Sequence, residues 1–194
     1  LIDCRSLSLT DAPVPAELAI MIVHSGVSRG LVEGHYNERR RQCEAAAKAM
    51  GVAALRDADM AMLAAAKLDP VTHSRARHVI SENQRTVEAA SALEKGDLQR
   101  LGTLMAESHQ SMRDDFEITV PAIDRLVDVL QKAIGNEGGA RMTGGGFGGA
   151  CVAVMPASRI PDVRAAVERG YQTPEGNKPM IMVETAGPGV RVMD

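Results

Sequence analysis

The sequence has few aromatic side chains and few cysteines. Aromatic residues make up 2% of the 194 residues, and tryptophan is absent. Eleven methionines, together with alanine, leucine and valine, must therefore fill the interior, which favours helices packed on a sheet through small side chains. The three cysteines form no CxxC pair. This pattern argues against a disulfide framework or a zinc site and fits a reducing, cytoplasmic location.

The chain also lacks a large charge of one sign and a long apolar run. Its formal net charge is −3, which argues against a nucleic-acid partner. No stretch predicts a membrane span and no signal peptide is visible, so we expect no membrane partner. The basic run Arg39-Arg40-Arg41 lies beside Glu38 and Glu44 in a helical pattern, and we interpret it as a solvated helix face.

No initiator methionine precedes the apolar pair Leu1-Ile2. We therefore expect the chain to be a fragment whose N-terminal partner domain is missing. A strand edge left exposed without that partner is expected to allow self-association of the chain.

The apolar spacing predicts strands over 1–7, 17–24, 139–143, 150–155 and 180–185. It predicts helices over 35–50, 57–66, 71–95, 98–112, 120–134 and 160–169, with Asp97 and Thr119 as N-cap residues. A helical middle flanked by strands indicates an α+β fold, an antiparallel sheet of about four strands with helices packed on one face. Segment 1–6 either extends this sheet or stays free.

The sharpest feature is a glycine cluster, with five glycines in the six positions 144–149. Glycine adopts positive φ without strain and lets the backbone approach another group closely. Successive exposed N–H groups in such a loop can form an anion-binding concavity. A plain turn between two strands would need only one or two glycines, so we expect this loop to lie near phosphate.

Known glycine motifs do not account for the cluster. Gly144, Gly146 and Gly149 satisfy GxGxxG, but that dinucleotide fingerprint requires a following helix, and here a strand-like run follows over 150–155. The sequence has no VAIK, HRD or DFG segment of a protein kinase and no GxxxxGK[ST].

The segment GGARMTGGGFGGACVAVMP resembles the third conserved motif of the GHMP kinases. The stretches LIDCRSL, YNERRRQCE, RARHVISENQRTVEAA and MAESHQSMRDDFEITVPAIDRLV resemble the galactokinase branch of that family. The resemblance runs from residue 1 to about residue 155. It implies that residues 1–194 form a GHMP kinase C-terminal domain, with a ferredoxin-like core and extra helices.

Enzymes of that branch transfer the γ-phosphoryl group of ATP to the C1 hydroxyl of α-D-galactose. The resemblance implies that ATP and Mg²⁺ are bound mainly by the absent N-terminal half, which also carries the proposed catalytic aspartate. It therefore assigns no catalytic residue and no metal ligand to this chain. Galactose, ATP and the N-terminal domain are the implied partners, and the chain alone is expected to be inactive.

Two sets of site residues are implied by the resemblance. Tyr36 matches the family tyrosine whose hydroxyl hydrogen-bonds galactose, whereas its spacing alone suits a tyrosine packed at the start of an amphipathic helix. The second set is the loop that supports the ATP phosphate loop, which here comprises Gly144, Gly145, Gly146, Phe147, Gly148 and Gly149.

Other polar residues receive structural interpretations. Asp114, Asp115 and Glu117 are interpreted as a helix cap and solvated charge rather than a magnesium site. Cys43 is interpreted as a packing residue, and the tail 187–189 as a turn beside the site.

Two alternative functions stay open. One is a non-catalytic module that senses galactose and ATP, and the other is a GHMP kinase for a different sugar such as N-acetylgalactosamine. The first differs from a galactokinase in the upstream phosphate loop, and the second requires a roomier pocket around Tyr36.

Overall fold

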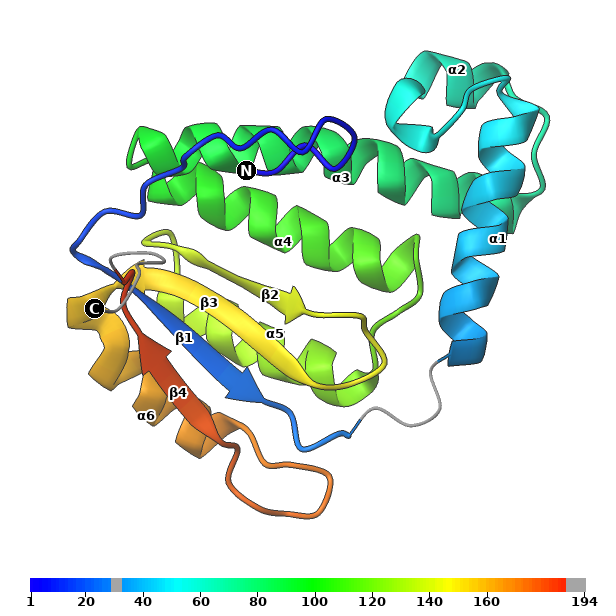
Figure 1. Cartoon of the computed structure of the whole chain (residues 1–194). Coiled ribbons are helices and arrows are strands. Elements are labelled where there is room, and N and C mark those ends of the chain that lie inside the picture. The colour runs from blue at the N-terminus through cyan, green and yellow to red at the C-terminus, as the bar shows by residue number, and fades with distance from the viewer. Residues whose placement is uncertain (29–32, 188–194) are drawn as a thin grey trace, which may run out of the picture.

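The structure, a computed structural model, describes residues 1–28 and 33–187 (Figure 1). Its elements in chain order are β1 (Leu18–His24), α1 (Glu33–Ala49), the 3-10 helix η1 (Leu55–Asp57), α2 (Met60–Ala65), α3 (Pro70–Glu94), α4 (Leu98–Asp114), α5 (Pro121–Ile134), β2 (Gly139–Thr143), β3 (Ala150–Pro156), the 3-10 helix η2 (Ala157–Arg159), α6 (Ile160–Gly170) and β4 (Ile181–Glu184). In these two described ranges, none of the helices combines the length and apolar character that a membrane crossing requires.

The strands form one antiparallel sheet in the order β2-β3-β1-β4. Strand β1 pairs with β3 over its whole length, from Leu18 opposite Pro156 to His24 opposite Ala150. Counting α5 as the first helix, β1, α5, β2, β3, α6 and β4 follow the β-α-β-β-α-β pattern of a ferredoxin-like core. Helices α1 to α4 are extra helices inserted after β1. The expected α+β class is confirmed, as are the strands predicted over 17–24, 139–143, 150–155 and 180–185.

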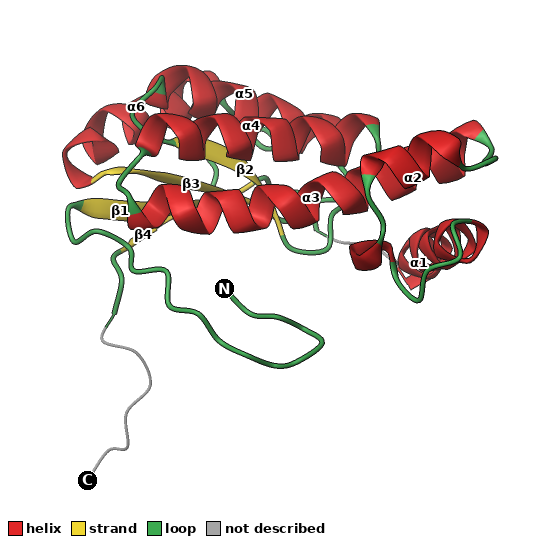
Figure 2. Ribbon diagram, turned by 90° about the horizontal axis from the view of Figure 1, so that it is seen from above, coloured by secondary structure: helices red, strands yellow, loops and turns green. Residues whose placement is uncertain are grey.

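Helices α5 and α6 cover one face of the sheet (Figures 1 and 2). The alternation of strand side chains explains this packing, because Cys151, Ala153 and Met155 of β3 are buried while their neighbours are half-buried. The apolar stripe of α5 meets that face with Ile123, Leu126, Val127, Leu130 and Ile134, and α6 adds Val163 and Val167. These side chains form the main core.

A second layer of helices carries α1 away from the sheet. Helix α4 packs beside β2, α3 packs on α4, and α1 packs on α3 (Figure 1). A separate apolar cluster holds the outer part of this layer together, formed by Ala46, Ala47, Leu55, Leu63, Ala76 and Ile80. The position of α1 relative to the sheet is therefore set by helix contacts rather than by strand pairing.

The strand predicted over 1–7 is wrong. Residues 1–10 form a small hairpin with one isolated bridge, between Ile2 and Leu9. The Asp3 carboxylate accepts hydrogen bonds from the backbone N–H groups of Arg5 and Ser6, which turns the chain, and Leu7 has a φ of 58°. Of the two alternatives for segment 1–6, the one in which it stays out of the sheet is the one observed.

Of the two predicted N-cap residues, the structure confirms one, and the helix predicted over 57–66 begins at Met60. Asp97 caps α4 by accepting from the Arg100 N–H at 2.9 Å, as predicted. Thr119 does not cap α5, because the N-cap is Val120, in extended conformation before Pro121. Proline disfavours the helical conformation in the preceding residue, so the boundary lies one residue later than predicted.

Two glycines allow α4 to lie directly against β2. A Cβ atom added at Gly102 of α4 would lie 1.9 Å from the carbonyl oxygen of Gly138, and one added at Gly139 would lie 2.6 Å from the Cα of Gly102. The backbones of helix and strand therefore meet without side chains between them. No rearrangement of a flexible side chain can relieve such an overlap, because both partners are backbone.

We predict that Gly102→Ala destabilises the fold although alanine is the better helix former. The overlap with Gly138 is expected to lower the free energy of unfolding by about 2 kcal/mol or more. The matched control is Gly34→Ala in α1, where no atom lies within 4 Å of the added Cβ, and which should gain up to about 1 kcal/mol. Urea unfolding monitored by circular dichroism measures both changes, and stabilisation by Gly102→Ala would contradict the close contact.

Candidate functional site

The glycine loop joins β2 to β3 in an unusual backbone conformation. Four successive residues have positive φ, with values of 85° at Gly146, 59° at Phe147, 131° at Gly148 and 86° at Gly149. Gly144 also has a positive φ, of 83°. Residues with side chains rarely adopt these values, so the glycine content is explained by the path of the loop rather than by flexibility.

The loop is held from both sides by backbone hydrogen bonds. On one side the Phe147 N–H donates to the carbonyl oxygen of Ile118 at 2.7 Å. On the other side the Gly149 N–H donates to the carbonyl oxygen of Val27 at 2.9 Å, and the Ser25 N–H and Oγ both donate to the carbonyl oxygen of Gly149. These two loop N–H groups are therefore occupied within the protein, whereas Gly144 and Gly145 are exposed at the tip.

Tyr36 lies in the first turn of α1, and 63% of its surface is exposed. The preceding residue ties this turn to the glycine loop, because the ring of His35 stacks on the ring of Phe147 with centroids 4.9 Å apart. The structure thus places the helical turn that carries Tyr36 beside the glycine loop. The exposed ring of Tyr36 does not match the interpretation of a tyrosine packed into the helix interface.

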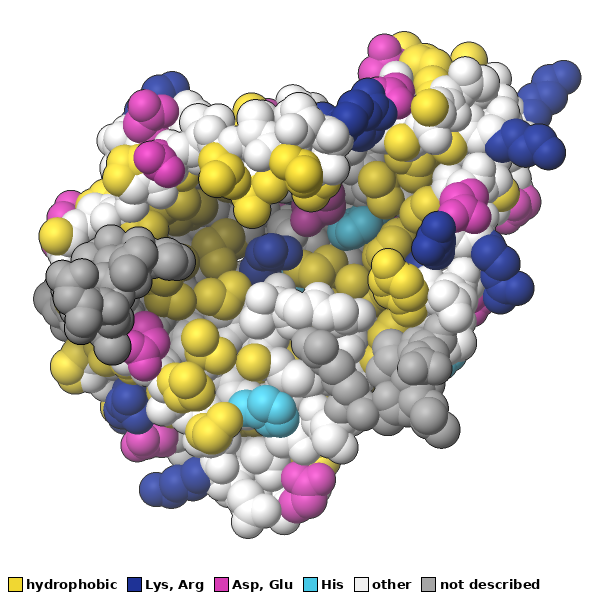
Figure 3. All heavy atoms as spheres, in the orientation of Figure 1, with side chains coloured by type: hydrophobic (Ala, Val, Ile, Leu, Met, Phe, Trp, Pro, Cys, Tyr) yellow, Lys and Arg dark blue, Asp and Glu magenta, His cyan; other side chains and the backbone are white. Residues whose placement is uncertain are grey.

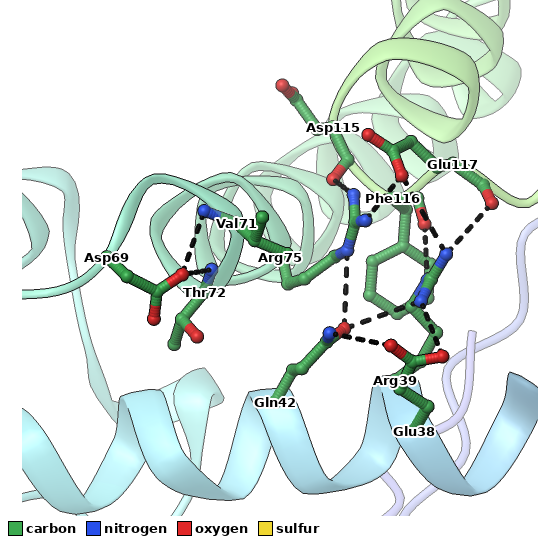
Figure 4. A network of polar contacts seen from close by, with 10 residues as sticks. All are labelled: Glu38, Arg39, Gln42, Asp69, Val71, Thr72, Arg75, Asp115, Phe116 and Glu117. Carbon is green, nitrogen blue, oxygen red and sulfur yellow. Dashed lines mark hydrogen bonds and ion pairs between the residues drawn. The ribbon is translucent and has the colours of Figure 1, made fainter.

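Two arginines hold the turn between α4 and α5, residues 115–118, which we name the α4–α5 corner (Figure 4). Arg39 of α1 donates through Nε to the carbonyl oxygen of Phe116 at 2.6 Å and through Nη2 to that of Glu117 at 3.1 Å. Arg75 of α3 donates to the carbonyl oxygen of Asp115 and, at 2.6 Å, to the Glu117 carboxylate. Three successive carbonyl groups are therefore satisfied by two guanidinium groups.

This network corrects the interpretation of several charged residues. Arg39 is 9% exposed, so the run 39–41 is not uniformly a solvated face, although Arg40 and Arg41 are exposed. Asp115 is buried as well, accepting from Ser111 Oγ at 2.9 Å and pairing with Arg77. The sequence reasoning missed Arg39 and Arg75, since only the packing of α1 on α3 shows which arginines face inward.

Burial shifts the pKa of several groups near the site. It lowers the pKa of His78 to about 4, so this imidazole, stacked on Phe116, is neutral at physiological pH. It raises the pKa of the Cys43 thiol, and it raises that of Cys151 to about 12, which disfavours a thiolate at either position. Among residues 1–28 and 33–187, no group of three or more His, Cys, Asp or Glu side chains is placed to hold a metal ion. Of the tail motif 187–189, Pro188 and Gly189 lie outside the described residues.

A hollow of about 270 Å³ lies beside the C-terminal part of α3, away from Tyr36. Apolar side chains such as Leu93, Leu104 and Met105 line it together with Arg85 and Arg141. Figure 3 shows hydrophobic side chains gathered in the hollowed part of this face, below α3. The hollow contains none of the residues that the sequence predicted for the site.

This chain is similar to known proteins in sequence and in structure. Residues 89–173 match the family model described as GHMP kinases C terminal. A curated galactokinase from Pasteurella multocida (strain Pm70) is 53% identical over 197 residues, which cover 99% of this chain and 51% of that protein. The chain therefore spans about half the length of the curated relative.

Solved structures show the same correspondence. The crystal structure of Lactococcus lactis galactokinase complexed with galactose superposes with a TM-score of 0.87 at 33% identity, covering 97% of this chain and 50% of that one. The L. major mevalonate kinase in complex with R-mevalonate gives a TM-score of 0.56 at 18% identity, covering 87% and 42%, and supports the fold alone.

We predict that Gly146→Val destabilises the loop for two separable reasons. Positive φ costs a branched residue about 1–2 kcal/mol, and the added Cβ would lie 2.6 Å from the Ile118 carbonyl oxygen, at a further cost of about 1–3 kcal/mol. The control Gly176→Val has a φ of 80° but no atom within 4 Å, so it should show the first cost alone. Unfolding free energies from denaturant titration test this, and equal losses in both variants would contradict the contact with Ile118.

Proposed function

We propose that this chain forms the C-terminal half of a galactokinase, because it is similar to a curated galactokinase along almost its whole length and because residues 89–173 match the model of the GHMP kinase C-terminal domain. In that role the intact protein transfers the γ-phosphoryl group of ATP to the C1 hydroxyl of α-D-galactose. The observation that carries the proposal is the identity to the Pasteurella enzyme, which runs along almost the whole chain rather than through one motif.

The proposal assigns the sugar side of the site to α1. The exposed hydroxyl of Tyr36 is available to donate a hydrogen bond to a sugar oxygen, and the first turn of α1 is anchored by the stacking of His35 on Phe147. The galactose bound in the Lactococcus structure supports galactose as the acceptor.

The phosphate side is assigned to the glycine loop as support. Phosphoryl transfer depends mainly on positioning and on stabilising charge, so a rigid neighbour of the nucleotide contributes to catalysis without contacting the reacting atoms. The N–H groups of Phe147 and Gly149 already have protein acceptors, which favours a supporting role over direct phosphate binding through these two groups. The exposed Gly144 and Gly145 are the part of the loop that faces outward.

We further propose that ATP and Mg²⁺ are held mainly by a preceding N-terminal half. The resemblance places the phosphate loop and the catalytic aspartate there. Magnesium bound with ATP would neutralise the charge that develops on the transferred phosphoryl group. This chain would then contribute the hydrogen bond from Tyr36 to the sugar and the glycine loop that supports the nucleotide site.

The first functional prediction concerns the 194-residue chain by itself. We expect no galactose-dependent formation of ADP in a coupled assay, because the proposed ATP site and catalytic aspartate belong to the other half. The protein that contains both halves serves as the positive control. Galactose-dependent ADP formation by the pure chain would contradict the assignment of the ATP site and the catalytic aspartate to the other half.

The second prediction concerns Tyr36→Phe in the two-domain protein. Loss of one hydrogen bond worth about 0.5–1.5 kcal/mol should raise the KM for galactose about threefold to tenfold. We expect kcat and the KM for ATP to change little, since this contact exists in ground state and transition state alike.

The matched control for Tyr36→Phe is Lys48→Gln, an exposed position in the last turn of the same helix, which should leave all three constants unchanged. Steady-state kinetics with galactose and with N-acetylgalactosamine also test the acceptor. Preference for the acetylated sugar would favour the alternative kinase, and unchanged galactose kinetics with altered thermal stability would assign Tyr36 to packing.

A further inference from the structure

Helix α1 contacts the glycine loop along two separate routes. The direct route is the stacking of His35 on Phe147. The indirect route starts at Arg39, one helical turn after Tyr36, and passes through the carbonyl groups of the α4–α5 corner. It ends where the carbonyl oxygen of Ile118 accepts the N–H of Phe147 at 2.7 Å. Together the two routes form a closed ring of contacts.

Few other side chains could make the contacts that Arg39 makes with the α4–α5 corner. Its Nε and Nη2 reach two successive carbonyl oxygens, which requires donors held in one plane by a rigid fork. Its Nη1 lies 3.5 Å from Gln42 Oε1, an amide oxygen that Arg75 Nε also contacts, at 3.3 Å. A lysine ammonium has no such fork and cannot satisfy the same two carbonyl groups with the same geometry.

We propose that Arg39 is a positioning residue that sets Tyr36 against the glycine loop, and so aligns the sugar with the phosphate side of the site. The inference rests on the proposed galactokinase function. Arg39 itself is buried, and the groups it binds are backbone carbonyls and side chains of this chain. Its influence on the reaction therefore passes through Tyr36 and Phe147.

The test is a double-mutant cycle with Arg39→Lys and Tyr36→Phe in the protein that contains both halves. If Arg39 acts through Tyr36, the two changes are not additive. We expect Arg39→Lys alone to lower kcat/KM for galactose at least about fivefold, as loss of a charged hydrogen bond predicts. Tyr36→Phe should then cost less than about twofold in the Arg39→Lys background, instead of its threefold to tenfold in the wild-type background.

The matched control is Arg159→Lys, which alters another arginine that donates to a backbone carbonyl. Arg159 Nη2 binds the carbonyl oxygen of Ala133 at 2.9 Å beyond the far end of β3 from the glycine loop. Tyr36→Phe should have the same effect with or without Arg159→Lys. Thermal melts of all variants report stability separately, so a purely structural loss is recognised by a lower Tm with additive kinetics.

The outcomes of this experiment distinguish a failure of the inference about Arg39 from a failure of the proposed galactokinase function. An inactive wild-type protein would refute the galactokinase proposal and, with it, the role of Arg39. An active wild-type protein with equal Tyr36→Phe factors in both backgrounds would overturn the inference alone. Should Arg39→Lys fail to fold, Arg39→Gln takes its place, since it also removes the guanidinium contacts with the carbonyl groups of Phe116 and Glu117. Equal Tyr36→Phe factors in the Arg39→Gln and wild-type backgrounds would likewise overturn the inference.

Discussion

The arrangement of the candidate site depends on how the three carbonyl groups of the α4–α5 corner are satisfied. A helix ends at Asp114 and the next begins at Pro121, so the carbonyl groups of residues 115–117 lie outside both helices, whereas that of Val120 accepts the N–H of Asp124 in α5. Glu117 bends the chain there with a φ of 51°, an uncommon value for a residue with a side chain. Buried carbonyl groups require donors, and Arg39 and Arg75 supply them from two other helices. Arg39 thereby attaches α1 to the corner, and Arg75 attaches α3.

Burying two guanidinium groups in one place is costly unless each is well paired. Burial, followed by the nearby charge of Arg75, lowers the pKa of Arg39, which shows that the two cations oppose one another. Carboxylates at the rim offset this repulsion, since Glu117 pairs with Arg75 at 2.6 Å and approaches Arg39 at 4.0 Å. Arg75 is only 3% exposed, so removing its partner would leave a buried charge unpaired, a more severe change than the loss of a surface ion pair. The network at the α4–α5 corner is therefore stable only when Arg39, Arg75 and Glu117 are all present.

Sequence patterns predicted the sheet, the six α-helices of the described residues and the location of the glycine loop, because each depends on local signals. A run such as 17–24 is nearly continuously apolar and contains β-branched residues, which is typical of a buried strand whatever its surroundings. The burial of Arg39 has no local signal, since Arg39, Arg40 and Arg41 are adjacent and only the contact with α3 selects one of them. The N-terminal hairpin was missed for a related reason, because the Asp3 carboxylate competes for backbone N–H groups that a strand would offer to the sheet. The stacking of His35 on Phe147 joins residues more than a hundred positions apart, and no single-sequence pattern reports such a pair.

The two sides of the candidate site are attached to the fold by different kinds of contact. The glycine loop is continuous with β2 and β3 and is bonded to Ile118 and Val27 through backbone groups alone. Its geometry therefore follows mainly from the ferredoxin-like core, and one side-chain hydrogen bond, from Ser25 Oγ to the carbonyl oxygen of Gly149, adds to these backbone contacts. The first turn of α1 belongs to the inserted helices and meets the core through side chains, namely the His35 ring and the Arg39 guanidinium. In the proposed function, the sugar side would therefore depend on a few side chains, whereas the phosphate side would depend on the path of the backbone.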